Sequence, residues 1–337
     1  MELGSDDLVL VTGATGLVGS HVAEQLLQRD IRTRVITREG SGTSQLEEWG
    51  AEVVAGDLTD AASLTKAVDG VSVIVHCAAK VGDWGPIEDY RTVNVRGLES
   101  LLDAVETANS LQRFVHISSL GVYEARDHHG TDESEPPNSE GIDGYTLTKV
   151  ESEAVVLNRI REGKLSATVL RPGFIYGPRD RTVLPRIFER LQSKSVKFLG
   201  SGDQLLNNTF VGNLVDAVFL AIERDDCVGE VFNITDGKLV SKREFISTIA
   251  KLGGFEVPTK SVPLPVAKAL ATLMEGTWRI LGKKEAPLLN NARIKFLGLW
   301  LDFCIDKARR QLGYEPKVEF ADGMRETIDW YREQGVL

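Results

Sequence analysis

The feature that most constrains this chain is a turn with three regularly spaced glycines, Thr12-Gly13-Ala14-Thr15-Gly16-Leu17-Val18-Gly19. It lies between an apolar run at residues 8–11, typical of a strand buried on both faces, and a segment at 17–29 whose apolar residues recur at helical spacing. The first glycine permits a sharp turn, the second lets a pyrophosphate approach the backbone, and the third lets the helix lie close to the sheet. This turn therefore predicts a βαβ unit that binds a dinucleotide.

Strand-like and helical segments continue to alternate along the first half of the chain. The strand-like runs are residues 33–37, 52–55, 71–76, 114–118 and 167–171, and the helical runs are 61–68, 90–108 and 145–161. Such alternation predicts crossover helices and a mostly parallel sheet. We therefore expect an α/β fold of the Rossmann type, a doubly wound parallel sheet, over residues 1–180.

The regular alternation ends after Pro172, where short elements follow one another: helices at 184–193, 213–223 and 242–252, and strands near 197 and at 230–234. We expect residues 181–337 to form a smaller α/β substrate-binding region, with some strands and helices returning to the first domain. Residues 125–144, which contain two prolines and several acidic side chains, are expected to form a long surface loop. His128 and His129 in this loop are expected to be solvated.

Composition excludes several classes of partner. The chain of 337 residues carries 39 Lys and Arg against 49 Asp and Glu, a net charge of −10, so nucleic acid is not expected, and an anionic membrane would require a strong local exception. The three cysteines are scattered, which fits a reducing compartment and excludes a disulfide framework. No metal site is expected, because the histidines show no ligand spacing.

The chain is expected to be a cytoplasmic protein. Its acidic N-terminus lacks the basic and apolar regions of a secretory signal. No apolar run reaches the roughly 18 residues of a membrane span.

The end of the second strand predicts which nicotinamide cofactor is preferred. An acidic residue there would accept hydrogen bonds from a ribose 2′-hydroxyl, but this chain has Arg38, which can bind a 2′-phosphate, so NADP is favoured over NAD. Alternatively, Arg38 only faces solvent. Asp57 and Leu58 follow the third strand, where the carboxylate can reach the adenine amino group and the leucine can pack on the ring. The alternative for Asp57 is a helix cap before residue 61.

Two residues suited to proton transfer lie four positions apart near the start of a helix. Tyr145 and Lys149 share one helix face, and a neighbouring ammonium favours the phenolate of a tyrosine. The strand at 114–118 delivers Ser118 and Ser119 to the carboxyl end of the sheet, where a hydroxyl can orient a substrate oxygen. The Asn94 amide can hold a water that links Lys149 to solvent, or can bond its helical neighbours.

These residues resemble those of the extended short-chain dehydrogenases/reductases. The resemblance rests on the glycine turn, Asp57-Leu58, His76-Cys77-Ala78-Ala79, Asn94-Val95-x-Gly97, Ser118-Ser119, Tyr145-x-x-x-Lys149 and Arg171-Pro172-Gly173-x-x-Tyr176-Gly177-Pro178, and it covers nearly the whole chain. Within that superfamily, the segments Ala79–Gly85, Asp89-Tyr90 and Leu312-Gly313-Tyr314-x-Pro316 resemble bacterial 3β-hydroxysteroid dehydrogenases and 3-oxoalkanoate reductases. A homodimer through helices such as 90–108 and 145–161 is compatible with the resemblance.

The resemblance implies a hydride transfer between a nicotinamide and a substrate carbon, with Tyr145 exchanging the proton on the substrate oxygen. It assigns the hydroxyl role to Ser119, because extended members show a Ser-x-x-x-Tyr spacing that Ser119 and Tyr123 match. The implied catalytic residues are Ser119, Tyr145, Lys149 and Asn94. The implied cofactor contacts are Gly13, Thr15, Gly16, Leu17, Val18, Gly19, Arg38, Asp57, Leu58, Ala78, Ala79, Tyr145, Lys149 and Pro172. Many steroid-type members carry an acidic residue at the position of Thr37 or Arg38, so this chain departs from them there.

The sequence therefore predicts an NAD(P)-dependent oxidoreductase acting on a hydrophobic secondary alcohol or ketone of 3β-hydroxysteroid or 3-oxoacyl type. One alternative is a nucleotide-sugar epimerase with the same Tyr145 and Lys149. Such enzymes usually carry an Arg-Asp-aromatic motif, where this chain has Asn208-Thr209-Phe210. A second alternative is a binding protein that senses NADP, which would not need a complete catalytic set.

A stripe of apolar residues at 262–281 predicts an amphipathic helix in the C-terminal region. A stripe of this kind usually packs in a core. It can also cover a hydrophobic substrate cleft, or make peripheral contact with a membrane surface without spanning it. Trp84, in a loop flanked by glycines, can line the substrate pocket or anchor the loop.

Overall fold

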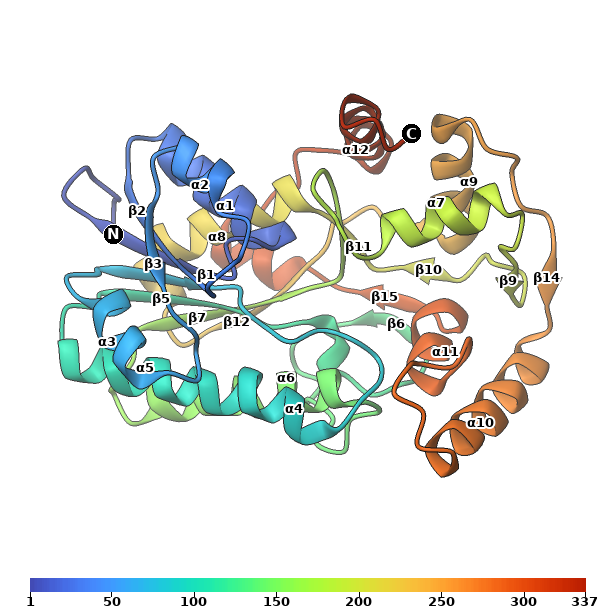
Figure 1. Cartoon of the computed structure of the whole chain (residues 1–337), viewed down its shortest axis with the longest axis horizontal. Coiled ribbons are helices and arrows are strands. Elements are labelled where there is room, and N and C mark those ends of the chain that lie inside the picture. Colours follow the sequence, from blue (N-terminus) through green and yellow to red (C-terminus); the bar gives the residue numbers. More distant parts are fainter.

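Seven parallel strands form the central sheet, in the order β12-β7-β5-β4-β1-β2-β3 (Figure 1). The computed structural model describes residues 1–337. The strands are β1 Leu8–Thr12, β2 Arg32–Thr37, β3 Glu52–Ala55, β4 Val73–His76, β5 Arg113–Ile117, β7 Ala167–Pro172 and β12 Val231–Ile234. The strand order reverses between β1 and β4, which is where open α/β sheets bind their ligands. The predicted Rossmann-type fold is confirmed.

Helices cover both faces of this sheet (Figure 1). On one face lie α1 Leu17–Gln28, α2 Ser44–Glu48 and α8 Val211–Glu223, and on the other lie α3 Ala61–Val68, α5 Gly97–Ala108 and α6 Gly144–Arg161. Along β1, Val9 and Val11 pack in the core on the face that α1 and α8 cover, and Leu10 packs in the core on the face that α3 and α5 cover. Burial on both faces explains why β1 is apolar at consecutive positions instead of alternating.

The helix predicted at residues 90–108 is longer and less regular than expected. It begins as α4, Ile87–Arg91, passes through a π-helical turn at Thr92–Arg96, and continues as α5. Asn94 lies within the π turn and is buried. Such turns often occur at functional sites.

The C-terminal region packs its own apolar core beside the carboxyl ends of the sheet. Its helices are α7 Leu184–Gln192, α9 Lys242–Gly253, α10 Leu264–Ile280, α11 Asn291–Gly298 and α12 Phe320–Glu333. Its short strand pairs are β8 Phe174–Tyr176 with β11 Asn208–Phe210, β9 Phe198–Leu199 with β14 Ser261–Val262, and β10 Leu205–Leu206 with β13 Val240–Ser241. Between these elements, α8 and β12 return to the central sheet. No helix is both long enough and apolar enough to cross a membrane.

The segment 125–144 is not wholly a surface loop, and His128 is not solvated. Residues His128–Thr131 form strand β6, which pairs with β15, Leu301–Phe303. The His128 ring is fully buried, lies 4.5 Å from the Phe303 ring and bonds to the Thr131 hydroxyl and the Glu124 carbonyl. Only His129 is exposed. The prediction failed because β6 is too short to show alternation and its partner lies far along the chain.

Two histidines are buried in the centre of the sheet. The His76 ring stacks on the rings of Phe114 and His116, with centroid distances of 5.9 and 5.6 Å. Thr12 bonds to His76 Nδ1, but neither ring nitrogen of His116 has a partner. Burial, reinforced by the Lys149 charge, lowers the pKa of His76 to about 3 and holds the pKa of His116 well below 6.5. Both rings are therefore neutral in the folded chain.

We expect the free energy of unfolding to decrease as the pH falls below 6.5, because the unfolded chain binds protons that the folded histidines exclude. The stabilisation is complete above pH 6.5 and is lost toward the low pKa values of the folded state. Each histidine should cost about 1 kcal/mol between pH 7 and pH 5.5. Urea unfolding of His116→Phe should show that much less pH dependence than the wild type. The matched variant His129→Gln, which alters an exposed ring, should keep the pH dependence of the wild type. The same change of unfolding free energy with pH in all three proteins would contradict the prediction.

Candidate functional site

The glycine turn has the shape predicted for it. Gly13 has a φ of +69°, and a Cβ on it would lie 2.8 Å from the Ala78 backbone. A Cβ on Gly19 would lie 2.4 Å from the Gly13 carbonyl oxygen. The turn therefore approaches the end of β4, and α1 approaches the turn, more closely than a side chain at either glycine would allow.

The start of α1 fits a phosphate group. Gly16 is its N-cap and provides no capping side chain, and Thr15 and Gly16 are exposed. The first backbone N–H groups of a helix, here those of Leu17 and Val18, have no partner within the helix, and they lie at its positive end. The residues present thus fit the pyrophosphate of a dinucleotide.

Arg38 and Asp57 lie near each other beyond the ends of β2 and β3. Arg38 is exposed, and its charge helps lower the pKa of Asp57, although hydrogen bonds from Thr59 contribute more. The Asp57 carboxylate accepts from the Thr59 amide and hydroxyl at 2.8 and 2.7 Å. It does not cap α3, because Asp60 does so through the Ala62 amide. The capping alternative for Asp57 was therefore wrong.

Other predicted cofactor contacts lie at neighbouring strand ends. Ala78 and Ala79 follow β4 and are half-buried, and the Ala78 amide donates to the Thr12 hydroxyl at 3.1 Å. Pro172 is the last residue of β7, one residue beyond the predicted strand end, and pairs with Ile234 of β12. Leu58 is buried beside Gly97.

Tyr145 and Lys149 come from the first turns of α6, which Asp143 caps through the Thr146 amide. The Lys149 ammonium lies 5.9 Å from the Tyr145 ring centroid and donates to the Ile117 carbonyl oxygen at 2.7 Å. Burial lowers the pKa of Lys149 to about 8 and raises the pKa of Tyr145 to about 12, the latter opposed by a hydrogen bond with Ser119. At neutral pH the phenol therefore holds its proton and can donate it.

The two serines after β5 point in different directions. Ser118 is buried, and its hydroxyl donates to the Glu153 carboxylate at 2.8 Å. Ser119 is half-buried, accepts from the Gly121 amide at 3.0 Å and interacts with the phenol of Tyr145. This geometry favours Ser119 as the hydroxyl of the site.

Asn94 is held by hydrogen bonds at both ends of its amide. Its oxygen accepts from the Lys80 amide at 2.6 Å, and its nitrogen donates to the Lys80 carbonyl and the Thr148 hydroxyl at 3.0 and 2.9 Å. It thus connects the loop after β4 to α6, beside Lys149. Its role in holding a water stays a prediction.

Trp84 anchors its loop to the C-terminal region. Its indole N–H donates to the Lys283 carbonyl at 3.0 Å, and its own carbonyl accepts from the Tyr90 hydroxyl at 2.8 Å. In the same loop, Asp83 pairs with Arg293 at 2.5 Å. The anchoring predicted for Trp84 is therefore observed, and its place in a substrate pocket stays a prediction.

Sequence reasoning missed Lys295, which reaches the site from α11. Its ammonium donates to the carbonyl oxygens of Gly121 and Tyr123 at 2.9 and 2.7 Å, on the turn that follows Ser119. Burial lowers its pKa to about 8, opposed by the Asp143 carboxylate. No motif or spacing marks this lysine, because its partners are backbone atoms of a segment far away in the sequence.

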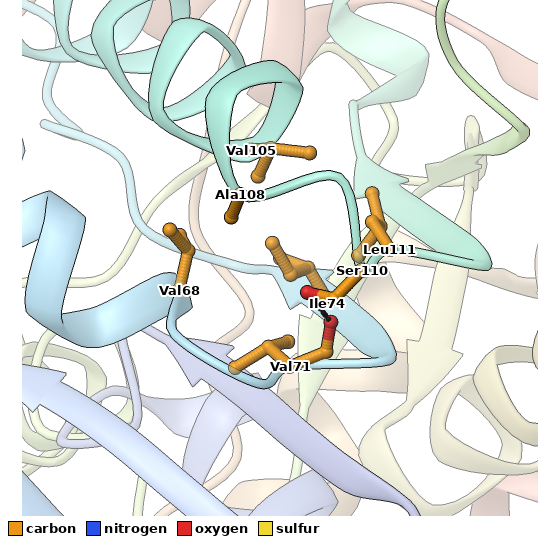
Figure 2. Close-up of a pocket in the computed structure, with 7 residues that line it drawn as sticks. All are labelled: Val68, Val71, Ile74, Val105, Ala108, Ser110 and Leu111. Atoms are coloured by element: carbon orange, nitrogen blue, oxygen red, sulfur yellow. Dashed lines mark hydrogen bonds between the residues drawn. The ribbon is translucent and has the colours of Figure 1, made fainter.

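A small apolar hollow lies elsewhere, at the amino ends of the strands (Figure 2). It is a shallow depression beside β4 and α5 with no room for a water molecule, and the Ser110 hydroxyl donates to the Val71 carbonyl at its edge. The predicted site residues follow the carboxyl ends, so this hollow is separate from them. No group of three or more His, Cys, Asp or Glu side chains is arranged to hold a metal ion.

Two curated proteins are similar to this chain over nearly all of its length. A 4-hydroxy-2-methyl-3-oxo-4-farnesyl-3,4-dihydroquinoline-1-oxide ketoreductase of Stigmatella aurantiaca is 31% identical over 93% of each chain. A 3 beta-hydroxysteroid dehydrogenase/Delta 5-->4-isomerase of Mycobacterium tuberculosis is 33% identical over 98% of this chain and 91% of its own.

Solved structures share the fold. The crystal structure of gox2253 superposes with a TM-score of 0.82 at 29% identity, covering 98% of this chain and 99% of the other. MoeE5 in complex with UDP-glucose and NAD gives a TM-score of 0.76 at 25% identity, covering 97% and 99%.

The model of the NAD dependent epimerase/dehydratase family matches residues 9–235, which contain the glycine turn and the Tyr145 and Lys149 pair. Together with the ketoreductase and dehydrogenase relatives, this match shows an oxidoreductase that acts on CH–OH groups with a nicotinamide cofactor. The chain belongs to the NAD dependent epimerase/dehydratase family, within the extended short-chain dehydrogenases/reductases.

Proposed function

We propose that this chain is an NADP-preferring reductase that interconverts a hydrophobic ketone and its secondary alcohol. The observation that carries the proposal is the placement of the half-buried Tyr145 phenol beside Ser119 and Lys149, at the strand ends next to the glycine turn. Relatives named as a ketoreductase and a hydroxysteroid dehydrogenase support a ketone or secondary alcohol as substrate.

The bound cofactor supplies or accepts the hydride at the substrate carbon. In the direction of reduction, the Ser119 hydroxyl holds the ketone oxygen, and Tyr145 donates its phenolic proton to that oxygen. The Lys149 ammonium stabilises the phenolate that remains. The reverse sequence, with Tyr145 as the base, oxidises the alcohol. The proximity of Lys149 to the Ile117 carbonyl fixes its ammonium beside the ring at the moment of transfer.

NADP preference rests on Arg38. The residue is exposed immediately after β2. A carboxylate at this position would repel the 2′-phosphate of NADP, whereas the Arg38 guanidinium attracts it. A guanidinium binds a phosphate through paired, charge-assisted hydrogen bonds.

An epimerase acting on a nucleotide sugar is the main alternative. The match to the family model and the similarity to MoeE5, solved with UDP-glucose, are consistent with it. The side chain at the position of the expected arginine argues against it. Asn208 is fully buried, donates to the Asp236 carboxylate at 2.8 Å and accepts from the Val240 amide at 3.1 Å. It supplies no cation for a diphosphate.

The deciding experiment measures NADPH and NADH oxidation with a panel of bulky ketones and 3-oxosteroids, with UDP-sugars as competitors. Ketone-dependent oxidation that UDP-sugars do not inhibit is the expected result. No turnover with any ketone, combined with tight UDP-sugar binding, would favour the epimerase.

Replacing Tyr145 by Phe should remove the proton donor while leaving the ring in place. We expect kcat for ketone reduction to fall by about 10²–10⁴-fold, the usual contribution of a positioned acid or base. NADPH affinity, measured by fluorescence titration, should stay within about threefold, since that phenol donates to the substrate. Unchanged turnover would exclude Tyr145 as the acid and would favour a protein that only senses the cofactor.

Replacing Arg38 by Ala should weaken NADPH binding about 10–100-fold, because charge-assisted hydrogen bonds to the phosphate are lost. NADH affinity should change little. Arg32→Ala provides the control, since Arg32 is exposed at the opposite end of the same strand. Equal losses for both cofactors would contradict the assignment.

Replacing Lys295 by Met should release the turn that carries Ser119, so Lys295 is a positioning residue. We expect kcat to fall about tenfold or more with little change in NADPH affinity, as misplacement of a catalytic hydroxyl reduces transition-state stabilisation. Lys295→Arg, which keeps the donors, should recover part of kcat. A parallel loss of cofactor affinity or of folding stability would indicate a purely structural role.

A further inference from the structure

Exposed apolar side chains gather at one end of the molecule. Nine large ones are exposed, and eight of these belong to residues 81–87 and 266–288: Val81, Ile87, Val266, Leu270, Leu273, Ile280, Leu281 and Leu288. The two segments meet through the Trp84–Lys283 hydrogen bond and the Asp83–Arg293 ion pair. Exposed apolar groups that cluster in this way mark an interaction site.

Helix α10 provides most of this surface, because it is apolar on two faces. Its inner face is made of small residues, Ala267 and Ala271, which are fully buried and belong to one small core with Leu199 and Ile294. Figure 1 shows α10 at the edge of the molecule, beside α11. Core packing therefore accounts for only part of the stripe, the inner face, where the partly buried Leu264 joins these two alanines.

The outer face of α10 is open. Val266, Leu270 and Leu273 follow one another at intervals of four and three residues and are 49, 44 and 67% exposed. Ile280 and Leu281 extend the stripe and are 87 and 60% exposed. We call these five residues the α10 surface. No other part of the chain covers it.

The charge around the α10 surface is opposite to that of the chain. Residues 264–285 contain Lys268, Arg279, Lys283 and Lys284 against Glu275 and Glu285, a net charge of +2 where the whole chain has −10. Glu275 is 12% exposed and pairs with Arg279. The three lysines are exposed and form no ion pair, so they present unneutralised positive charge beside an aliphatic stripe.

We propose that the α10 surface binds the surface of an anionic lipid bilayer, with the aliphatic stripe inserted among the acyl chains near the headgroups and the lysines against the lipid phosphates. Amphipathic helices with basic flanks bind membranes through burial of apolar side chains and electrostatic attraction to anionic lipids together. A second copy of this chain fits less well, because a two-fold interface would place the cationic segment against itself. Membrane binding by the α10 surface does not depend on the activity proposed above. If the chain is a reductase as proposed, the surface also gives a hydrophobic ketone a route from the bilayer toward the site.

Cosedimentation of the full chain with vesicles tests the proposal. Binding is expected to vesicles of phosphatidylcholine mixed with phosphatidylglycerol, to be weak to phosphatidylcholine alone, and to decrease with salt. The variant Lys283→Gln/Lys284→Gln should bind about 30-fold more weakly, since each lysine near an anionic surface contributes a factor of about five. The variant Leu270→Glu/Leu273→Glu should not bind measurably.

Matched controls exclude a general effect of charge or hydrophobicity. Lys194→Gln/Lys238→Gln changes exposed lysines elsewhere, and Val336→Glu changes an exposed aliphatic side chain elsewhere. Both should bind like the wild type. Equal losses in the controls, or no binding to mixed vesicles, would overturn the proposal. A dimer in solution that Leu270→Glu/Leu273→Glu dissociates, without vesicle binding, would assign the surface to a second copy.

Reduction of a water-soluble ketone without vesicles separates this proposal from the proposed function. All the variants should keep wild-type turnover there, because none of the altered residues lies in the site. A wild-type chain that binds mixed vesicles but reduces no ketone would retain the lipid surface and refute the reductase. A chain that reduces ketones but ignores vesicles would do the opposite.

Discussion

The ion pair between Glu153 and Arg171 fixes the frame on which the candidate site is built. Both side chains are almost fully buried, and they join α6, which carries Tyr145 and Lys149, to β7. The Glu153 carboxylate also accepts from Ser118, and the Arg171 guanidinium donates to the Tyr123 hydroxyl at 2.7 Å. Two buried charges are costly to desolvate and remain favourable only when their hydrogen bonds are satisfied, so this network tolerates few other arrangements of α6 and the turn after β5. The Ser118 hydroxyl is used in this network, whereas the Ser119 hydroxyl lies outside it and faces Tyr145.

The same frame explains the electrostatics of the site. Lys149 is buried with a carbonyl oxygen as its direct partner, and Glu153, the carboxylate whose charge acts on it, is already paired with Arg171. Its ammonium is thus incompletely neutralised, which is consistent with a pKa near 8 and with the low pKa values of His76 and His116 nearby. The ammonium lies 5.9 Å from the Tyr145 ring, where a cation favours the phenolate, while the Asp143 carboxylate opposes that effect.

The parts of the fold that the sequence predicted are those governed by local rules. The glycine turn, the strand and helix periods, and the four-residue spacing of Tyr145 and Lys149 each report a short-range geometric requirement. The errors have a common origin in contacts between distant segments. His128 is buried by Phe303, the helix at 90–108 contains a π turn whose Asn94 bonds to Lys80, and Lys295 reaches backbone carbonyls about 170 residues earlier. Periodicity within a segment contains no information about such partners.

Helix α11 connects the site to the far end of the molecule. Lys295 on this helix holds the turn that follows Ser119, while Ile294, the preceding residue, lies against the inner face of α10. Adjacent residues on a helix point in different directions, so one short helix contacts both the Ser119 turn and the helix that carries the exposed stripe. The Asp83–Arg293 pair adds a second connection from α11 to the loop beside Lys80 and Asn94. The contacts of α11 thus make the C-terminal region part of the support of the Ser119 turn, whereas the exposed outer face of α10 takes no part in those contacts.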